Sequence, residues 1–178
     1  MFKVKVSDAI IQHCMRQVEI HNFGQRYTAN GTKEQQLTGI IGQSVIMQLF
    51  GLPLVDGNSG FDGGVDITYN GITIDVKTMG RTTDVRDYYV HNFVGLQMYL
   101  NPDAYIFCSF NKTNNELTVC GWVTKEQFKE RSLFFKKGST RKRSDGTEFK
   151  TFSDLYEIPN RELNDIESIE QLKRDISK

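Results

Sequence analysis

The sequence lacks long apolar runs and has few cysteines. Its three cysteines, Cys14, Cys108 and Cys120, are widely spaced among 178 residues and form no CxxC pair. This odd set argues against a disulfide framework and a zinc site, and predicts reduced thiols in a cytoplasmic protein. No stretch approaches the roughly 20 apolar residues that a transmembrane helix needs. The first residues alternate charged with apolar side chains and do not form a signal-peptide core, so we expect no membrane contact.

The sequence also lacks an excess of charge of either sign. Lysine plus arginine number 22, as do aspartate plus glutamate. Net charge therefore gives no argument for nucleic acid, and a polyanion site would have to come from local clustering. Hydrophobic residues make up 38% of the chain and aromatic residues 11%, which is typical of a folded domain. No repeat or linker interrupts the chain, so we expect one domain over 1–178 with its core at about 33–131.

Local patterns predict a mixed α/β domain around one sheet. Amphipathic spacing and capping residues predict helices at 8–20, 33–50 and 125–131, and alternating apolar residues predict strands at 104–110 and 116–123. Weaker patterns favour a short helix at 93–100, an exposed flexible loop at 136–146 and helix within 158–176. Buried positions for Cys108 and Cys120 follow from the two strands.

The most informative stretch is residues 63–77, with the sequence GGVDITYNGITIDVK. Asn-Gly between two alternating β-branched runs predicts a two-residue type I′ hairpin turn. With Asn70 and Gly71 as the turn, Ile67 pairs with Ile74, and Asp66 faces Asp75. Directly opposed side chains share a face, with Cβ atoms roughly 4.5–5.5 Å apart. The hairpin therefore predicts two neighbouring carboxylates.

The two faces of this hairpin differ sharply in polarity. Lys77 lies two residues beyond Asp75, so the alternation of a strand places it on the polar face. The apolar face consists of Val65, Ile67, Ile72, Ile74 and Val76. Opposed aspartates repel each other, and a divalent cation between them would remove the repulsion. The alternative is an ordinary solvated face on which Lys77 bridges Asp75.

Asp66, eight intervening residues and then Asp75-Val76-Lys77 resemble the signature of the PD-(D/E)XK nuclease superfamily. The preceding helix contains Gly39-Ile40-Ile41-Gly42-Gln43, which is similar to an element of that family, with Gln43 at the position of an acid. The resemblance covers residues 33–123. It implies a restriction-endonuclease-like fold, a mixed central β-sheet flanked by helices.

The resemblance also implies a catalytic site and a cofactor. Asp66, Asp75 and Lys77 would be catalytic, and Mg²⁺ or Mn²⁺ would be held by Asp66, Asp75, the backbone oxygen of Val76 and the side chain of Gln43. Such a cation neutralises charge that develops on phosphate oxygens and acidifies the attacking water. We therefore expect an endonuclease that hydrolyses phosphodiester bonds, with DNA as the first candidate substrate and a homodimer for duplex cutting. Catalytically inactive nucleic-acid binding and cleavage of RNA are the alternatives.

Local clustering of positive charge provides candidates for phosphate contacts. The densest group lies between residues 136 and 143 and consists of Lys136, Lys137, Arg141, Lys142 and Arg143. Arg81 follows the catalytic strand and is a further candidate. A solvated loop is the competing interpretation of the 136–143 group.

Overall fold

The computed structural model describes residues 1–24, 31–59, 63–142 and 146–177. Its helices are α1 (Asp8–Ile20), α2 (Lys33–Leu49), α3 (Lys125–Arg131) and α4 (Ile169–Ile176), with short 3₁₀ turns η1 (Gly57–Ser59), η2 (Gly95–Gln97) and η3 (Asn160–Glu162). Its strands are β1 (Phe2–Lys5), β2 (Ile67–Tyr69), β3 (Ile72–Arg81), β4 (Val90–Val94), β5 (Ala104–Asn111), β6 (Glu116–Thr124), β7 (Leu133–Phe135), β8 (Thr140–Lys142), β9 (Glu148–Lys150) and β10 (Leu155–Pro159).

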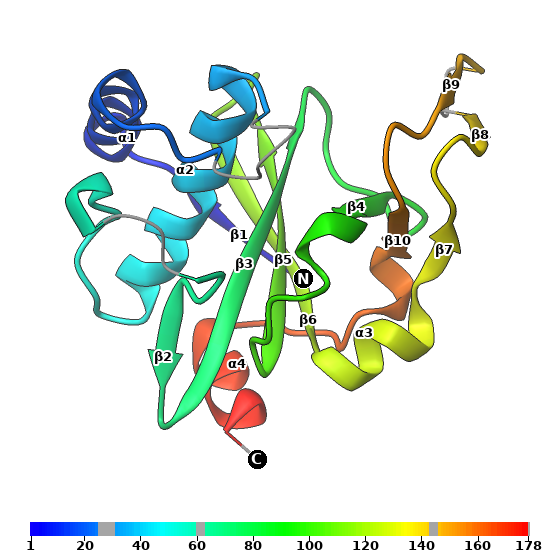
Figure 1. Ribbon diagram of the computed structural model, residues 1–178. Helices are drawn as coiled ribbons and strands as arrows, with labels where there is room; N and C mark the ends of the chain where they lie inside the picture. Colours follow the sequence, from blue (N-terminus) through cyan, green and yellow to red (C-terminus); the bar gives the residue numbers. More distant parts are fainter. Residues whose placement is uncertain (25–30, 60–62, 143–145, 178) are drawn as a thin grey trace.

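A five-stranded mixed sheet forms the centre of the molecule. Its strand order is β1-β6-β5-β3-β2. Strands β3 and β5 are parallel, and the other neighbouring pairs are antiparallel. Helices α1 and α2 lie on one side of this sheet (Figure 1), and Ile40, Val45, Ile74 and Ile106 are buried in the core between them. The protein is therefore a mixed α/β domain, as the sequence predicts.

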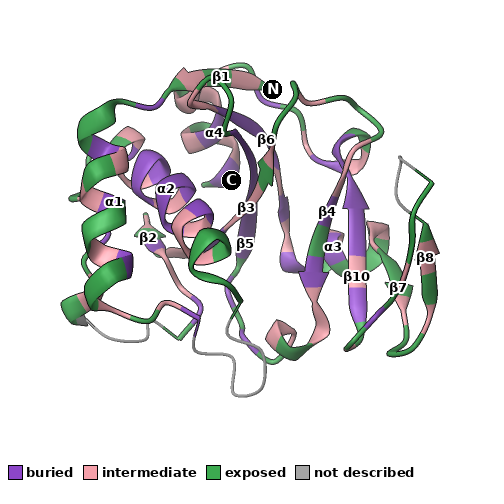
Figure 2. Cartoon of the chain, turned by 90° about the horizontal axis from the view of Figure 1, so that it is seen from above, coloured by how far each residue is buried: buried purple, intermediate pink, exposed green. Residues whose placement is uncertain are grey.

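The opposite face of the sheet is covered by α3 and by a second, three-stranded sheet of order β4-β10-β7. Figure 2 shows β10 with β4 and β7 on the side of the molecule away from α1 and α2. Between the two sheets lies an aromatic core that contains Phe93, Tyr105, Phe107 and Phe128. Strand β3 is therefore enclosed between a helical layer and a strand layer.

Several local predictions are confirmed. Ser7 caps α1 by accepting a hydrogen bond from the Ile10 backbone, and α2 ends one residue before the predicted position. Thr124 and Gln127 form the reciprocal capping box of α3. Strands β5 and β6 match the predicted strands within one residue at each end. These elements depend on signals within a few residues of the chain, which is why the sequence predicts them well.

Other predictions are wrong in part. The segment 93–100 is the end of β4 followed by η2 instead of a helix. The predicted exposed loop at 136–146 contains β8, which pairs with β9, and the region 158–176 begins with the end of β10. The single predicted sheet is three sheets. Strands β4 and β10 form by pairing with each other across a long stretch of sequence, which a local pattern does not record, whereas β8 and β9 form a local hairpin.

Close contact between α2 and β3 leads to a prediction about stability. A Cβ added to Gly42 would lie 1.9 Å from Thr78 Oγ1 and 2.8 Å from Thr78 Cβ. Threonine is stiff about χ1, so we expect Gly42→Ala to destabilise the protein by about 1–3 kcal/mol. Gly39→Ala is the matched control, because no atom lies within 4 Å of its added Cβ and alanine favours a helix by about 1 kcal/mol. Urea unfolding should shift the two variants in opposite directions, and equal shifts would contradict the prediction.

Candidate active site

The predicted hairpin is present, with the predicted turn and register. Asn70 and Gly71 have φ values of 50° and 83°, as a type I′ turn requires. Ile67 pairs with Ile74, Thr68 with Thr73 and Tyr69 with Ile72. Ile67 and Ile74 are buried against the helical layer, so the apolar face of the hairpin is directed as predicted.

The predicted pairing of Asp66 with Asp75 is wrong, because the regular ladder ends at Ile67. The Asp66 N–H donates to the carbonyl of Ile74 at 2.9 Å, one residue short of Asp75. Gly63 and Gly64 precede this point with φ values of 70° and 82°. Such positive values turn the chain in a way that other residues rarely adopt. Asp66 therefore lies just outside β2, at the point where the two strands separate.

Beyond Ile74, β3 is no longer paired with β2. This edge of β3 is contacted by the Asp66 side chain. Asp66 Oδ2 accepts a hydrogen bond from the Val76 N–H at 2.6 Å. A strand residue directs its N–H and C=O toward the same side, so the Val76 carbonyl oxygen faces the same edge as the Asp66 carboxylate. The predicted register is correct up to Ile67 and Ile74, but a backbone contact beyond the end of the ladder, instead of an opposed pair, brings Asp66 to β3.

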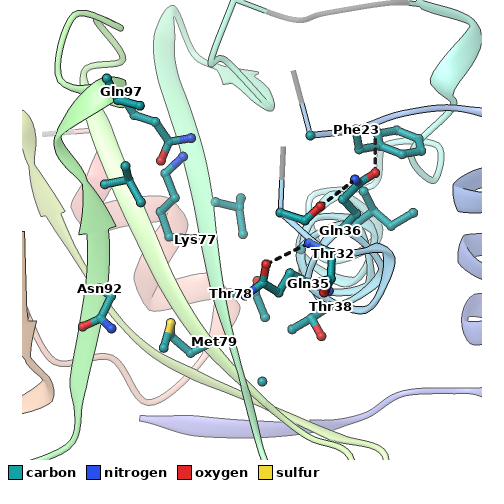
Figure 3. Close-up of a pocket in the computed structure, with 18 of the residues that line it drawn as sticks. Phe23, Thr32, Gln35, Gln36, Thr38, Lys77, Thr78, Met79, Asn92 and Gln97 are labelled. Carbon is teal, nitrogen blue, oxygen red and sulfur yellow. Dashed lines mark hydrogen bonds between the residues drawn. The ribbon is translucent and has the colours of Figure 1, made fainter. Parts of the chain in front are cut away.

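A large cleft follows this open edge between α2 and β4. Its volume is about 1180 Å³, and its lining includes every residue of the predicted metal and catalytic set: Gln43, Asp66, Asp75, Val76 and Lys77. Figure 3 shows residues from the start of α2 on one side of Lys77 and Asn92 and Gln97 on the other. The structure therefore brings the predicted residues together in one cavity.

Asp75 and Lys77 form an ion pair at the floor of the cleft. Lys77 Nζ lies 2.7 Å from Asp75 Oδ2, with side-chain exposures of 18% for the lysine and 4% for the aspartate. The Lys77 ammonium also lies 5.3 Å from the centroid of the Phe93 ring. The Lys77–Asp75 contact is the bridge expected for an ordinary hairpin face. Such a face would be solvated, however, whereas the Asp75 side chain is buried.

Tyr105 lies beside Asp75 on the neighbouring strand. Burial, and then the negative charge of Asp75, raise the pKa of the Tyr105 hydroxyl. Among the described residues this buried hydroxyl has no hydrogen-bond partner. Asp75 thus lies in a buried environment of low polarity beside Tyr105, where electrostatic interactions are stronger than in water.

The oxygen donors of the cleft fit a hard divalent cation. Mg²⁺ binds through one or two carboxylates and keeps several waters, and the carboxylates of Asp66 and Asp75 share this cavity with Val76 and the Gln43 amide. Within the described ranges, no group of three or more His, Cys, Asp or Glu side chains is arranged to hold a metal. A metal held by Asp66 and Asp75 would therefore depend on two acidic ligands, with the neutral Gln43 amide as a further oxygen donor in the cavity.

His91 lines the same cleft from β4 and is fully buried. Its Nε2 lies 2.7 Å from Asn160 Oδ1, and its ring packs against Phe107 at 5.0 Å between centroids. Burial, assisted by the nearby positive charge of Arg81, lowers the pKa of His91 to about 4. The imidazole is therefore neutral at physiological pH.

The lowered pKa of His91 predicts a pH-dependent stability. Between pH 6.5 and pH 4, the unfolded chain binds a proton at His91 that the folded protein does not. The free energy of unfolding therefore falls as the pH falls through this window, by about 3 kcal/mol at most. Urea unfolding of the wild type and of His91→Gln should show this slope in the wild type alone. Parallel pH profiles for the two proteins would contradict the prediction.

The candidates for phosphate contacts differ in their surroundings. The Arg81 guanidinium donates to the Val90 carbonyl at 2.7 Å and lies 4.8 Å from the centre of the Tyr89 ring. Arg141 pairs with Glu157 at 2.5 Å and stacks on Phe135. The three lysines Lys136, Lys137 and Lys142 are exposed, and Arg143 lies outside the described residues. Among the described members of the predicted cluster, the lysines are more exposed than Arg141.

Sequence reasoning missed part of the cleft wall. Leu96, Tyr99 and Phe152 line the cleft with exposures of 43%, 65% and 65%. They come from two segments about fifty residues apart in the sequence, and no motif or periodicity connects these segments. Only the pairing of β4 with β10 brings them to one wall.

Comparisons of the chain with protein-family models, with curated proteins and with solved structures gave no significant match. No helix in the described ranges has the length and apolarity needed to cross a membrane. The candidate site therefore rests on the geometry of its own residues.

Proposed function

We propose that the protein is a metal-dependent endonuclease of the PD-(D/E)XK type, with a restriction-endonuclease-like core, and that it hydrolyses phosphodiester bonds. One observation carries this proposal. Asp66, Asp75 and Lys77, separated in sequence by a hairpin, line one cleft at the open edge of β3. DNA is the first substrate to test, and a homodimer would allow both strands of a duplex to be cut.

Each residue has a distinct role in the proposed reaction. Asp66, Asp75 and the Val76 carbonyl would hold Mg²⁺ or Mn²⁺, with Gln43 as a further oxygen donor. The cation, when bound, supplies Lewis-acid stabilisation of phosphate charge and a more acidic water. Lys77 orients that water or places a fixed positive charge beside the pentacovalent phosphorus. Its Nζ is held at 2.7 Å from Asp75, so the ammonium is already positioned next to one of the metal-ligand candidates.

A second candidate function is nucleic-acid binding without catalysis. The neutral amide of Gln43, at the position of an acid, favours this alternative. RNA is the alternative substrate for both functions.

A nicking assay separates these functions. Supercoiled plasmid DNA and a single-stranded RNA would be incubated with the protein in Mg²⁺, in Mn²⁺ and in EDTA. We expect cleavage with either metal and none in EDTA, and loss of cleavage in Asp66→Ala. Binding without cleavage of any substrate would support the inactive alternative, and cleavage in EDTA would overturn the metal mechanism.

A further inference from the structure

We infer that the cleft receives a single-stranded segment of nucleic acid, whose unpaired bases stack on Tyr99 and Phe152. This inference rests on the proposed function, since it names the substrate form of the same site, and it implies that a duplex such as supercoiled DNA enters only where its strands are locally unpaired. The cleft volume of about 1180 Å³ exceeds the roughly 300–1,000 Å³ of small-molecule pockets. The space therefore suits a segment of a polymer.

Tyr99 and Phe152 form the part of the cleft lining that we call the aromatic wall, and their rings are exposed. Tyr99 and Phe152 are each 65% exposed and line the cleft. In the part of the chain that the structure describes, neither ring contacts another aromatic ring. Exposed aromatic faces beside a charged site stack on bases of any sequence, because every base has a π-face. The wall thus offers two platforms for unpaired bases.

The two platforms belong to one rigid wall. The Gly95 N–H donates to the Asp154 carbonyl at 2.7 Å, which ties η2 to the segment between β9 and β10. A Cβ added to Gly95 would lie 2.7 Å from Asp154 Cβ, so the two backbones approach closely. This contact joins the segment that carries Leu96 and Tyr99 to the segment that carries Phe152, and all three residues line the cleft.

Charge in and around the cleft favours a single strand over a duplex. Among the described lining residues, the only lysines or arginines are Lys77 and Lys112, which are paired with Asp75 and Glu34. A duplex presents one phosphate charge per about 1.7 Å and is held mainly by cations. The described part of the lining offers a duplex no uncommitted cation, whereas base stacking needs none.

The exposed residues Lys136 and Lys137 do not line the cleft, but they lie on a segment, here called the rim, that is bonded to the residues flanking Phe152. Asp154 Oδ1 accepts from the Lys137 N–H at 2.8 Å, and Thr151 Oγ1 donates to the Lys136 carbonyl at 2.9 Å. The lysine segment is therefore anchored to the same residues that carry Phe152. A strand whose bases stack on the wall could pass its phosphates along this rim, an arrangement that single-strand binding proteins share.

The test is a binding measurement in EDTA, which keeps it independent of cleavage. Fluorescence anisotropy would compare four probes of equal length: an oligothymidylate, an oligouridylate, an abasic deoxyribose strand and a blunt duplex. We expect both base-containing single strands to bind more tightly than the abasic strand and the duplex. The tighter of the two identifies DNA or RNA as the source of the bases. Binding of the abasic strand or of the duplex as tight as that of the single strands would overturn the inference.

Matched variants assign the binding to the wall. Tyr99→Ala and Phe152→Ala should each weaken single-strand binding about tenfold and leave abasic binding unchanged, whereas Phe152→Tyr should retain it. The controls are Tyr88→Ala and Phe134→Ala, which remove exposed aromatic rings outside the cleft. Equal affinities for all variants would overturn the inference. Equal affinities combined with metal-dependent nicking would overturn only the stacking inference. Weaker binding in the Tyr99 and Phe152 variants without any cleavage would contradict only the nuclease proposal.

Discussion

Asp75→Asn is expected to reduce metal-dependent cleavage by about 10³-fold or more. The substitution keeps the shape of the side chain but removes one of the two aspartate carboxylates proposed to hold the metal, and a metal contributes several kcal/mol to phosphoryl transfer. Gln43 is neutral, so the site has no third acidic ligand at that position to compensate. Initial rates of plasmid nicking in saturating Mg²⁺ and Mn²⁺ would measure the loss.

Asp103→Asn is the matched control for this variant. Asp103 contacts the same strand, where its Oδ2 accepts from the N–H and the hydroxyl of Thr73 at 2.8 and 2.7 Å. It does not line the cleft, so its replacement should leave the nicking rate nearly unchanged. Equal rates for the wild type and Asp75→Asn would refute the role of Asp75, as would equal losses in both variants.

The part of this site that the sequence predicts is the part that local chemistry determines. Asn70 and Gly71 specify a tight turn, the turn specifies the register, and the register places Ile67 and Ile74 in the core. Alternation along β3 then separates Asp75 and Lys77 from Val76. Each step uses contacts between residues close in sequence, so no knowledge of the rest of the fold was needed.

The exact position of Asp66 could not be predicted in the same way. Extrapolating the register assumes that the ladder continues, but the glycines before Asp66 turn the chain away at Ile67. The burial of Asp75 was also unpredictable, because its neighbour Tyr105 comes from β5, about thirty residues further along the chain. The alternation of polar and apolar residues predicts which way the side chains of a strand point. Whether solvent reaches those side chains depends on segments that are distant in sequence.

The second sheet explains the remaining differences. Strand β4 pairs with β10 across about sixty-five residues of sequence, and the 93–100 segment carries no local signal for that pairing. The same pairing places His91, Tyr99 and Phe152 around the cleft. One wall of the candidate site is thus a consequence of long-range topology, which a single sequence does not disclose.

Lys77→Met is expected to destabilise the protein by about 3 kcal/mol or more, in addition to abolishing cleavage. Methionine preserves the length of the side chain but removes the ammonium that lies 2.7 Å from Asp75, whose side chain is 4% exposed. Removing one partner of a buried ion pair costs about 3–5 kcal/mol, because a charge is left in a poorly solvating environment. Lys112→Met is the control. Its partner Glu34 lies at the surface, so that variant should change stability little.

A double-mutant cycle separates the structural role of Lys77 from its chemical role. The combination Asp75→Asn with Lys77→Met removes both charges, and we expect it to recover most of the stability lost in Lys77→Met alone. Cleavage should stay absent in the double variant, since both the metal ligand and the ammonium are gone. Urea unfolding and plasmid nicking on the same preparations would measure the two effects. Additive losses of stability would show that the ion pair is not what Lys77 contributes, and recovered cleavage would remove both residues from the proposed mechanism.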